Sequence, residues 1–319
     1  MAPLSITALG LAGLAAVLAV PVPTLLARAD WPRGNPRAAL VLWQAIGLAG
    51  GLAAIGAGLA VAVAPLAEHL LPGLWTLGLQ TLAGHPLAGL GPLNLLGLAW
   101  AAAMELLLLG VLARQALATL RARVRHRRLV DLVTGPCACP GAADARVVAT
   151  TTPLAYCLPG LRPRLVLSAG TLALLDPCQL AAVIEHERAH LRARHDLVIL
   201  PFLALRATLP WVPWLRRAHE AAHDAVTTLV EMLADDCACR RHERRVLATA
   251  LVRVATATTP TAALAASATT PTEGATLARV RRLLDPPHPV PAWVPPAAYL
   301  LAAALLLVPT LLLALPLAA

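Results

Sequence analysis

The chain has 319 residues, of which 58% are hydrophobic and only 13% are charged. This composition argues against a pair of ordinary soluble domains and indicates a membrane protein that carries one modest polar domain. The net charge is +9, and all 26 basic residues are Arg. Because aromatic residues make up only 3% of the chain and no basic run is interleaved with stacking residues, we expect no direct binding of nucleic acid.

Three apolar segments early in the chain are long enough to cross a bilayer as helices, at about 1.5 Å per residue. They lie at about Pro3–Ala27, Ala38–Leu66 and Leu93–Ala113. The first segment could instead be a signal peptide, since Ala27-Arg28-Ala29 resembles a cleavage site, but it lacks a basic n-region. We therefore predict a retained span. The third segment contains Glu105, which we expect to face neighbouring helices or water.

The placement of the Arg residues predicts the orientation in the plasma membrane. Six of them crowd a helical extension of the third span: Arg114, Arg121, Arg123, Arg125, Arg127 and Arg128. The connection at 28–37 is also basic, whereas 67–92 has no Arg and, being rich in Pro and Gly, predicts a loop or a re-entrant piece. The positive-inside rule then puts the N-terminus outside and the chain after residue 114 in the cytoplasm, up to a last span at about Pro296–Leu317.

This orientation predicts three regions: a three-span membrane region at 1–113, a cytoplasmic domain at 114–292 and a fourth transmembrane helix at 293–319. Within the cytoplasmic domain, Arg146–Thr151 and Pro163–Ser168 have strand character. A strand that lies near an active-site helix could pair with extended substrate.

A capped helix is predicted to begin at Asp176, in the stretch Asp176–Asp196. Asp176 suits the N-cap, Pro177 suits the first helical position, and Gln179 completes a capping box.

This helix carries the motif H-E-x-x-H at His186, Glu187 and His190. Residues four apart project from one face of a helix, so both imidazoles could grip one zinc ion while Glu187 acts on the metal-bound water. An amphipathic surface helix that happens to carry two His and a Glu would show the same three positions. The rest of the chain must decide between these interpretations.

A catalytic zinc ion usually takes three protein ligands. We choose Glu231 as the third, because Asp235 shares its helical face and could hold a ligating His. Glu220 and His223 are the reserve candidates, and Glu243 is a further acidic residue downstream. An ordinary acidic helix surface is the competing interpretation.

The apolar segment Leu197–Leu215 could be mistaken for another span. A crossing here would separate His186 and His190 from Glu231, and Arg206 would cost about 2.5–3.5 kcal/mol at mid-membrane. The segment is also interrupted by Pro201, Pro210 and Pro213. We therefore predict a bent helical hairpin that packs on the membrane surface or on other spans.

Taken together, the string Ser168-Ala-Gly, the H-E-x-x-H helix, the apolar Trp/Pro segment and Glu-x-x-Ala-Asp resemble the BlaR/MecR-type integral-membrane zinc metallopeptidases. A more distant resemblance is to the HtpX and CAAX prenyl protease group. The resemblance implies a mainly α membrane protein of four transmembrane helices, with an α+β zincin-like domain between the third and the fourth. It also implies His186, His190 and Glu231 as zinc ligands and Glu187 as general base. The BlaR/MecR sensors carry a penicillin-binding domain after the last span, so antibiotic sensing by that route is not expected here.

The sequence therefore predicts a membrane-embedded zinc metalloendopeptidase that acts on a protein or peptide. Candidate substrates are a cytoplasmic repressor, the chain itself and misfolded membrane proteins. One alternative is a zinc-binding membrane scaffold without turnover. Another is a structural metal site at Cys137-x-Cys139 and Cys237-x-Cys239, although incidental reduced thiols are favoured because C-x-C is less typical of zinc sites than C-x-x-C.

Overall fold

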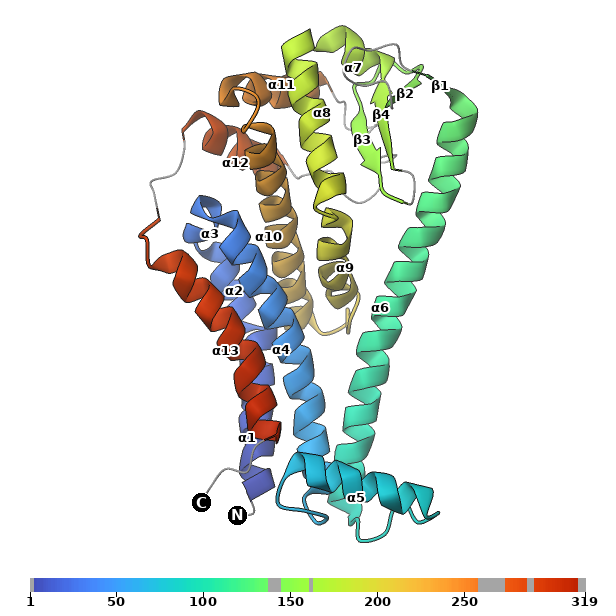
Figure 1. Ribbon diagram of the computed structural model, residues 1–319, viewed down its shortest axis with the longest axis vertical. Helices are drawn as coiled ribbons and strands as arrows, with labels where there is room; N and C mark the ends of the chain where they lie inside the picture. The colour runs from blue at the N-terminus through green and yellow to red at the C-terminus, as the bar shows by residue number, and fades with distance from the viewer. Residues whose placement is uncertain (1–2, 137–144, 161–162, 258–272, 286–289, 315–319) are drawn as a thin grey trace.

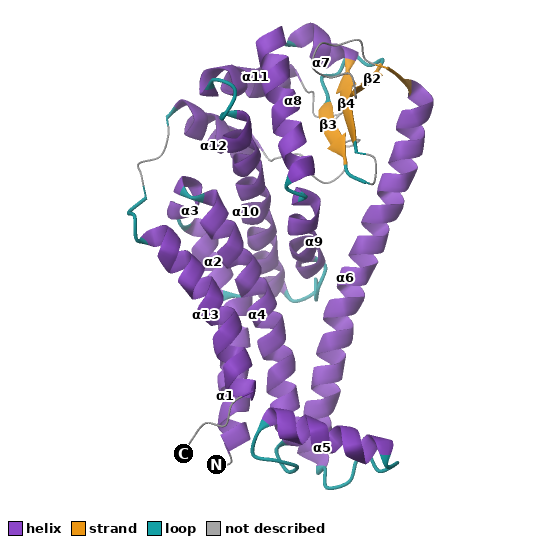
Figure 2. Cartoon of the chain, in the orientation of Figure 1, coloured by secondary structure: helices purple, strands orange, loops and turns teal. Residues whose placement is uncertain are grey.

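The computed structural model describes residues 3–136, 145–160, 163–257, 273–285 and 290–314. Within these ranges the chain is mainly helical and contains one small sheet (Figures 1 and 2). The helices are α1 (Pro3–Ala19), α2 (Pro21–Arg28), α3 (Trp31–Gly34), α4 (Pro36–Val63), α5 (Leu70–Leu82), α6 (Pro92–Val133), α7 (Ala169–Leu174), α8 (Pro177–Arg192), α9 (His195–Arg206), α10 (Pro213–Ala238), α11 (Arg244–Ala257), α12 (Glu273–Leu284) and α13 (Val294–Ala314). The strands are β1 (Thr134–Pro136), β2 (Ala145–Val148), β3 (Ala155–Leu158) and β4 (Arg164–Ser168).

Three helical stretches are long and apolar enough to cross a membrane: Leu4–Arg28, Pro36–Val63 and Pro92–Val133. The first stretch comprises α1 and α2, which are separated at Val20 because Pro21 has no N–H to continue the helix. A fourth apolar stretch, Val294–Leu307 of α13, is shorter. It packs along α4, against Ile46 and Ala49 (Figure 1).

Helix α5 occupies the segment for which a loop or a re-entrant piece was predicted, and that prediction was incomplete. Pro72 falls in the first turn of α5, where its missing N–H would have no intrahelical partner. Gly73 lies against Val63, and a Cβ added there would come within 2.7 Å of the Val63 side chain. The Pro and Gly residues that predicted a loop therefore occupy positions that a helix tolerates.

Helix α6 joins the third apolar segment to the sheet without a break. Its 42 residues include the Arg-rich extension and would measure about 63 Å. It runs from α5 at one end of the molecule to the sheet at the other (Figure 1). There Asp131 pairs with Arg164, and Val130 packs with residues of β3 and β4. Glu105 is exposed on α6, so it does not pack against a neighbouring helix.

The sheet has the strand order β1-β2-β4-β3. The two predicted strands correspond to β2 and β4, which pair in parallel, whereas β3 and β1 pair antiparallel with their neighbours. Ile184 of α8 packs against Leu165 and Leu167 of β4. Strand β3 is at one edge of the sheet and next to α8, so one strand edge lies beside the helix that carries H-E-x-x-H (Figure 2).

The segment Leu197–Leu215 is a helical hairpin, as predicted. Helix α9 ends at Arg206, the chain turns through Leu209 at a positive φ of 47°, and α10 begins at Pro213. Trp43 of α4 packs edge-on against Phe202 of α9, with ring centroids 6.3 Å apart. This contact joins the hairpin to α4. Helices α8, α9 and α10 therefore belong to the same packed unit as α4.

Helices α4 and α6 approach each other closely at two glycines. A Cβ added to Gly58 would lie 2.7 Å from the carbonyl oxygen of Gly97, and a Cβ added to Gly97 would lie 2.7 Å from that of Gly58. Small residues at a helix contact let the two backbones approach and gain van der Waals energy. Gly110, also on α6, has no atom within 4 Å of such a Cβ.

We predict that Gly97→Ala lowers the thermal unfolding midpoint in detergent, because the added methyl group pushes α4 and α6 apart. Overpacking of this kind costs about 1–3 kcal/mol. The matched control is Gly110→Ala, which should leave the midpoint unchanged or raise it, since Ala favours the helix by up to about 1 kcal/mol. Equal midpoints for the two variants would contradict the close α4–α6 contact.

Candidate metal centre

Local sequence positions the start of α8. The Asp176 carboxylate accepts hydrogen bonds from the N–H groups of Cys178 and Gln179, at 3.0 and 2.9 Å, and Gln179 completes the capping box. The helix ends at Arg192. Arg194 is left-handed, with a φ of 52°, and α9 begins directly after it.

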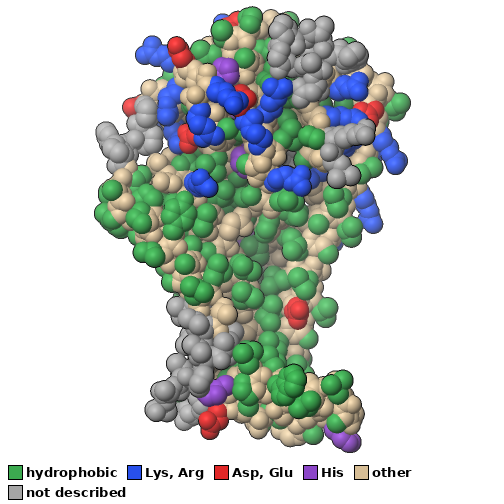
Figure 3. Space-filling model, viewed as in Figure 1, with side chains coloured by type: hydrophobic (Ala, Val, Ile, Leu, Met, Phe, Trp, Pro, Cys, Tyr) green, Lys and Arg blue, Asp and Glu red, His purple; other side chains and the backbone are tan. Residues whose placement is uncertain are grey.

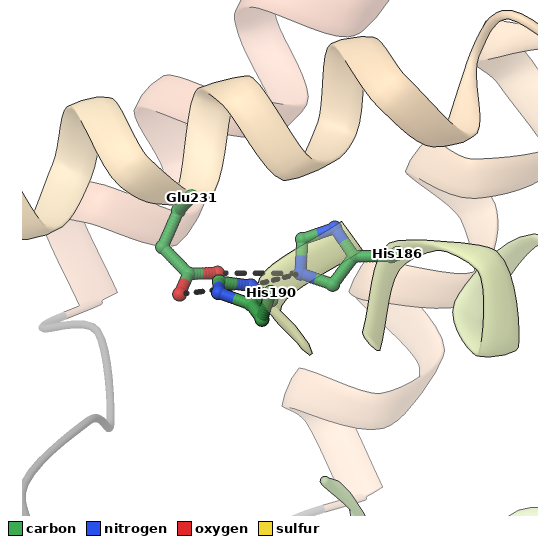
Figure 4. Close-up of side chains that lie close together, drawn as sticks. All are labelled: His186, His190 and Glu231. Atoms are coloured by element: carbon green, nitrogen blue, oxygen red, sulfur yellow. Dashed lines mark hydrogen bonds and ion pairs between the residues drawn. The ribbon is translucent and has the colours of Figure 1, made fainter. Parts of the chain in front are cut away.

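His186 and His190 project from α8 toward Glu231 on α10 (Figure 4). The Nε2 atoms of the two imidazoles are 3.2 Å apart. The Glu231 carboxylate lies 3.4 Å from Nε2 of His186 and 3.5 Å from Nε2 of His190. The side chains of His186 and Glu231 are buried, with 6% and 13% of their surfaces exposed.

These three separations fit a shared metal ion. Ligand atoms that lie about 2.0–2.1 Å from a tetrahedral metal are about 3.3 Å from one another. Two imidazoles and a carboxylate form a donor set that suits a divalent metal and leaves a fourth position open. Among the described residues, this is the group of His, Cys, Asp and Glu side chains that could hold a metal.

Asp235 and Arg279 surround these residues with charge. Oδ1 of Asp235 lies 3.0 Å from Nδ1 of His186, on the side of the ring away from Nε2. Arg279 of α12 donates two hydrogen bonds to Asp235, at 2.8 and 2.7 Å, and its Nη1 lies 2.9 Å from Glu231. Only 1% of the Asp235 side chain and 4% of the Arg279 side chain are exposed. Arg279 is therefore a buried cation that is paired with both carboxylates.

A second Arg of α12, Arg282, also binds a carboxylate of α10. Arg282 makes two hydrogen bonds to Asp236, at 2.7 and 2.9 Å, and a third to the carbonyl of Arg33 at 2.8 Å. Arg279 and Arg282 are one helical turn apart, and so they meet the adjacent carboxylates Asp235 and Asp236 from one side of α12.

Glu187 faces the same centre from the β3 side. Burial raises its pKa to about 7, and the backbone N–H of Cys157 on β3 opposes that rise by donating a hydrogen bond to the carboxylate. A carboxylate with a pKa near neutrality can both accept and return a proton at physiological pH.

The pKa values of the metal-free cluster reflect burial set against these contacts. Burial lowers the pKa of His186, but its contacts with Asp235 and Glu231 outweigh burial and raise the pKa to about 9. Burial raises the pKa of Glu231, but His186 and Arg279 outweigh it and lower the pKa to about 2. Burial lowers the pKa of His190 to about 3. Glu231 therefore holds a negative charge beside the histidines, as a metal ligand must.

The reserve ligand candidates lie outside this cluster. Glu220 is partly exposed and pairs with Arg216 on its own helix. His223 is buried and lies 3.4 Å from the exposed Asp224. Glu243 is exposed beyond the end of α10.

The Cys residues do not join the cluster either. Cys237 accepts hydrogen bonds from Arg192 and Arg240. Cys239 is partly buried. Cys137 and Cys139 lie outside the described residues.

Two residues in contact with the candidate ligands were not expected from the sequence. Arg279 shares a face of α12 with the fully buried Leu283, and a single Arg in that apolar stripe was the available signal. His195 lies with its Nδ1 3.0 Å from Nδ1 of His190, and burial lowers the pKa of His195. The sequence places His195 five residues after His190 and carries no marker for this contact.

The fold and the centre together define a metallopeptidase with apolar helices of membrane-spanning length. Residues 120–289 match the model of Peptidase family M48. That region is more than half of the chain and contains α8, α10 and α12, so the chain belongs to this metallopeptidase family. Comparison with curated proteins and with solved structures gives no significant match.

We predict that Arg279→Ala lowers the free energy of unfolding of the metal-free protein by about 3–5 kcal/mol, because it removes the buried guanidinium that is paired with both Glu231 and Asp235. The measurement is denaturant or thermal unfolding in detergent after chelation.

The control for this change is Arg281→Ala on the same helix. Arg281 is exposed, and its replacement should change stability by no more than about 0.5 kcal/mol. If both variants unfold like the wild type, Arg279 does not balance the buried carboxylates.

Proposed function

We propose that the chain is a membrane-embedded zinc metalloendopeptidase, in which His186, His190 and Glu231 hold the metal and Glu187 is the general base. The observation that carries the proposal is the convergence of three side chains: the two imidazole Nε2 atoms are 3.2 Å apart, and the Glu231 carboxylate approaches one of them with Oε2 at 3.4 Å and the other with Oε1 at 3.5 Å. Membership of Peptidase family M48 supports the assignment to metallopeptidases.

Zinc suits the donor set better than other common divalent ions. Imidazole nitrogen and carboxylate oxygen are ordinary zinc ligands, and two His with one Glu leave the fourth position that a catalytic site needs. The contact between Asp235 and Nδ1 of His186 also fits, because a metal-bound imidazole usually donates its second N–H to a carboxylate. A magnesium or calcium site would be built from oxygen atoms alone.

The chemistry divides between the metal and Glu187. A zinc ion held here would supply a Lewis acid that lowers the pKa of water and polarises the scissile carbonyl. Glu187 accepts the proton of the attacking water and later returns it to the leaving amine. Burial, which raises the pKa of Glu187 in the metal-free protein, favours the protonated carboxyl group that must exist between the two transfers. Asp235 and Arg279 keep His186 and Glu231 oriented while the proton moves.

Strand β3 is our candidate for holding the substrate. It is at the edge of the sheet, and the backbone N–H of Cys157 points from it to Glu187. An extended peptide that adds to this edge by backbone hydrogen bonds would pass over the general base. Such binding selects an extended conformation more than a particular sequence, so unfolded or flexible segments of proteins are the expected substrates.

The charge distribution supports a catalytic domain on the cytoplasmic face of the plasma membrane, with four spans formed by α1–α2, α4, α6 and α13. Arg side chains gather over the part of the molecule that contains α8, α11, α12 and the sheet, whereas apolar side chains cover the part that contains α1, α4 and α13 (Figure 3). Trp211 and Trp214 at the tip of the α9–α10 hairpin are 74% and 61% exposed, which suits a membrane interface. The active site would then lie close to the inner leaflet.

The two family resemblances favour different substrates. The likeness to BlaR/MecR-type peptidases favours cleavage of a cytoplasmic repressor or of the chain itself. The likeness to the HtpX group favours misfolded membrane proteins. A zinc-binding scaffold without turnover would keep the ligands and would have no use for Glu187.

We predict that Glu187→Gln keeps bound zinc but lowers the rate of peptide hydrolysis about 10²–10⁴-fold, because the amide cannot accept the water proton. Purified wild type and variant are compared for zinc content and for cleavage of an unfolded protein in detergent, with the products identified by mass spectrometry. Self-cleavage is followed in the same samples.

The matched control is Glu185→Gln, two residues earlier on α8. The Glu185 carboxylate pairs with Arg192 and Arg241 and is neither a candidate ligand nor the general base, so the control should cleave at the wild-type rate. A Glu187→Gln variant with full activity would rule out the mechanism. Zinc binding without cleavage by the wild type would favour the scaffold.

We also predict that Glu231→Gln weakens zinc binding by more than about 100-fold, which exceeds the loss expected on removing a partner that only supports a ligand. Glu220→Gln, eleven residues earlier on α10, should bind zinc like the wild type because Glu220 lies at the surface with Arg216. Competition with a chelator of known affinity measures both. If Glu220→Gln weakens zinc binding and Glu231→Gln does not, Glu231 is not the third ligand.

A further inference from the structure

The buried imidazole of His195 is in contact with the candidate ligand His190. The Nδ1 atoms of the two rings are 3.0 Å apart, and the ring planes meet at 86° with centroids 4.9 Å apart. His195 is only 5% exposed. Neither the metal-binding group nor the proton transfers assigned to Glu187 use this residue.

The direction of the contact decides which roles are open to His195. Nε2 of His190 faces His186 and Glu231, so Nδ1 lies on the opposite side of its ring. His195 therefore lies behind His190 and is not a fourth ligand. An imidazole that binds a metal through Nε2 carries its proton on Nδ1, and that N–H needs an acceptor. Nδ1 of His195 lies within hydrogen-bond distance of that atom.

The break between α8 and α9 creates this contact. In one continuous helix, residues five apart point about 140° away from each other. Here the left-handed Arg194 ends α8 and turns the chain, so that His195 faces back to His190. The next residue, Asp196, pairs with Arg123 of α6 at 2.8 Å, with both side chains mostly buried. The start of α9 is therefore held to the helix that continues the third span.

We propose that His195 is a positioning residue for His190, accepting the Nδ1–H of the ligand imidazole and fixing its ring toward the metal. This inference rests on the proposed zinc site. It assigns to a neutral imidazole the work that metal sites usually give to a carboxylate, a carbonyl or a water, and that Asp235 would do for His186. The two ligand histidines are then supported by different chemical groups.

The experiment compares zinc affinity among full-length variants purified in detergent. His195→Phe keeps a ring of similar size without an acceptor and should weaken zinc binding about 10–100-fold. His195→Asn places an amide oxygen close to the former Nδ1 and should restore most of the affinity. Co(II) replaces zinc in a parallel series, where the visible absorption bands should shift in the Phe variant and return in the Asn variant.

The control is His219→Phe, which removes another buried histidine, on α10. His219 is 8% exposed and is about 18 Å along the helix from Glu231, so its replacement should leave zinc affinity unchanged. The inference is overturned if His195→Phe binds zinc like the wild type. It is also overturned if the Phe and Asn variants weaken binding equally, or if the His219 control weakens it as much.

Two further outcomes separate this inference from the proposed function. If the wild-type protein binds no zinc, both the proposed function and the role of His195 are wrong. If the wild type binds zinc and His195→Phe binds it equally well, only the role of His195 is wrong. Should the Phe variant fail to fold, nitrogen NMR of histidine-labelled, zinc-loaded wild type tests the same contact. A neutral His195 ring without a proton on Nδ1 supports the inference, and a proton on that atom overturns it.

Discussion

The buried ion pair of Arg279 with Asp235 and Glu231 is the interaction on which the centre depends. Two carboxylates and two imidazoles cannot be brought together inside a protein unless their charge is balanced, because a lone buried charge costs several kcal/mol. Arg279 supplies a counter-charge to both carboxylates while no metal is present, and it joins α12 to α10 in doing so. Helix α10 also packs directly on α8, which brings Glu231 beside the two histidines.

The same body links the centre to the apolar helices. Gln44 of α4 donates a hydrogen bond to the carbonyl of Val198 on α9, and Trp43 packs against Phe202. Helix α6 reaches the start of α9 through Arg123 and the sheet through Val130. A change in the packing of α4 or α6 would therefore shift α9, which contacts His190 through His195, and the sheet that contains β3. This continuity gives a physical route between the predicted spans and the chemistry.

The sequence predicted the local features well, because each has a local cause. The cap at Asp176 and the spacing of His186 and His190 follow from helix geometry, and the long apolar segments follow from composition. The strands β2 and β4 were marked by β-branched and apolar residues. Helix α5 was not predicted, because Pro72 and Gly73 usually indicate a loop in a sequence. Both are tolerated here, at the start of a helix that packs against Val63.

What the sequence determined by itself, then, is the long apolar helices, the capped start of α8 and the face that carries the two histidines, since these depend on residues within a few turns of one another. Only the tertiary structure decided that Glu231, rather than Glu220 or His223, lies beside those histidines. It alone decided that Arg279, about 90 residues from His186, balances the charge there. His195 contacts His190 because Arg194 adopts a left-handed conformation, and no Gly, Asn or Pro at that position indicates this turn in the sequence. Contacts of this kind depend on how distant helices pack, and no local pattern records that packing.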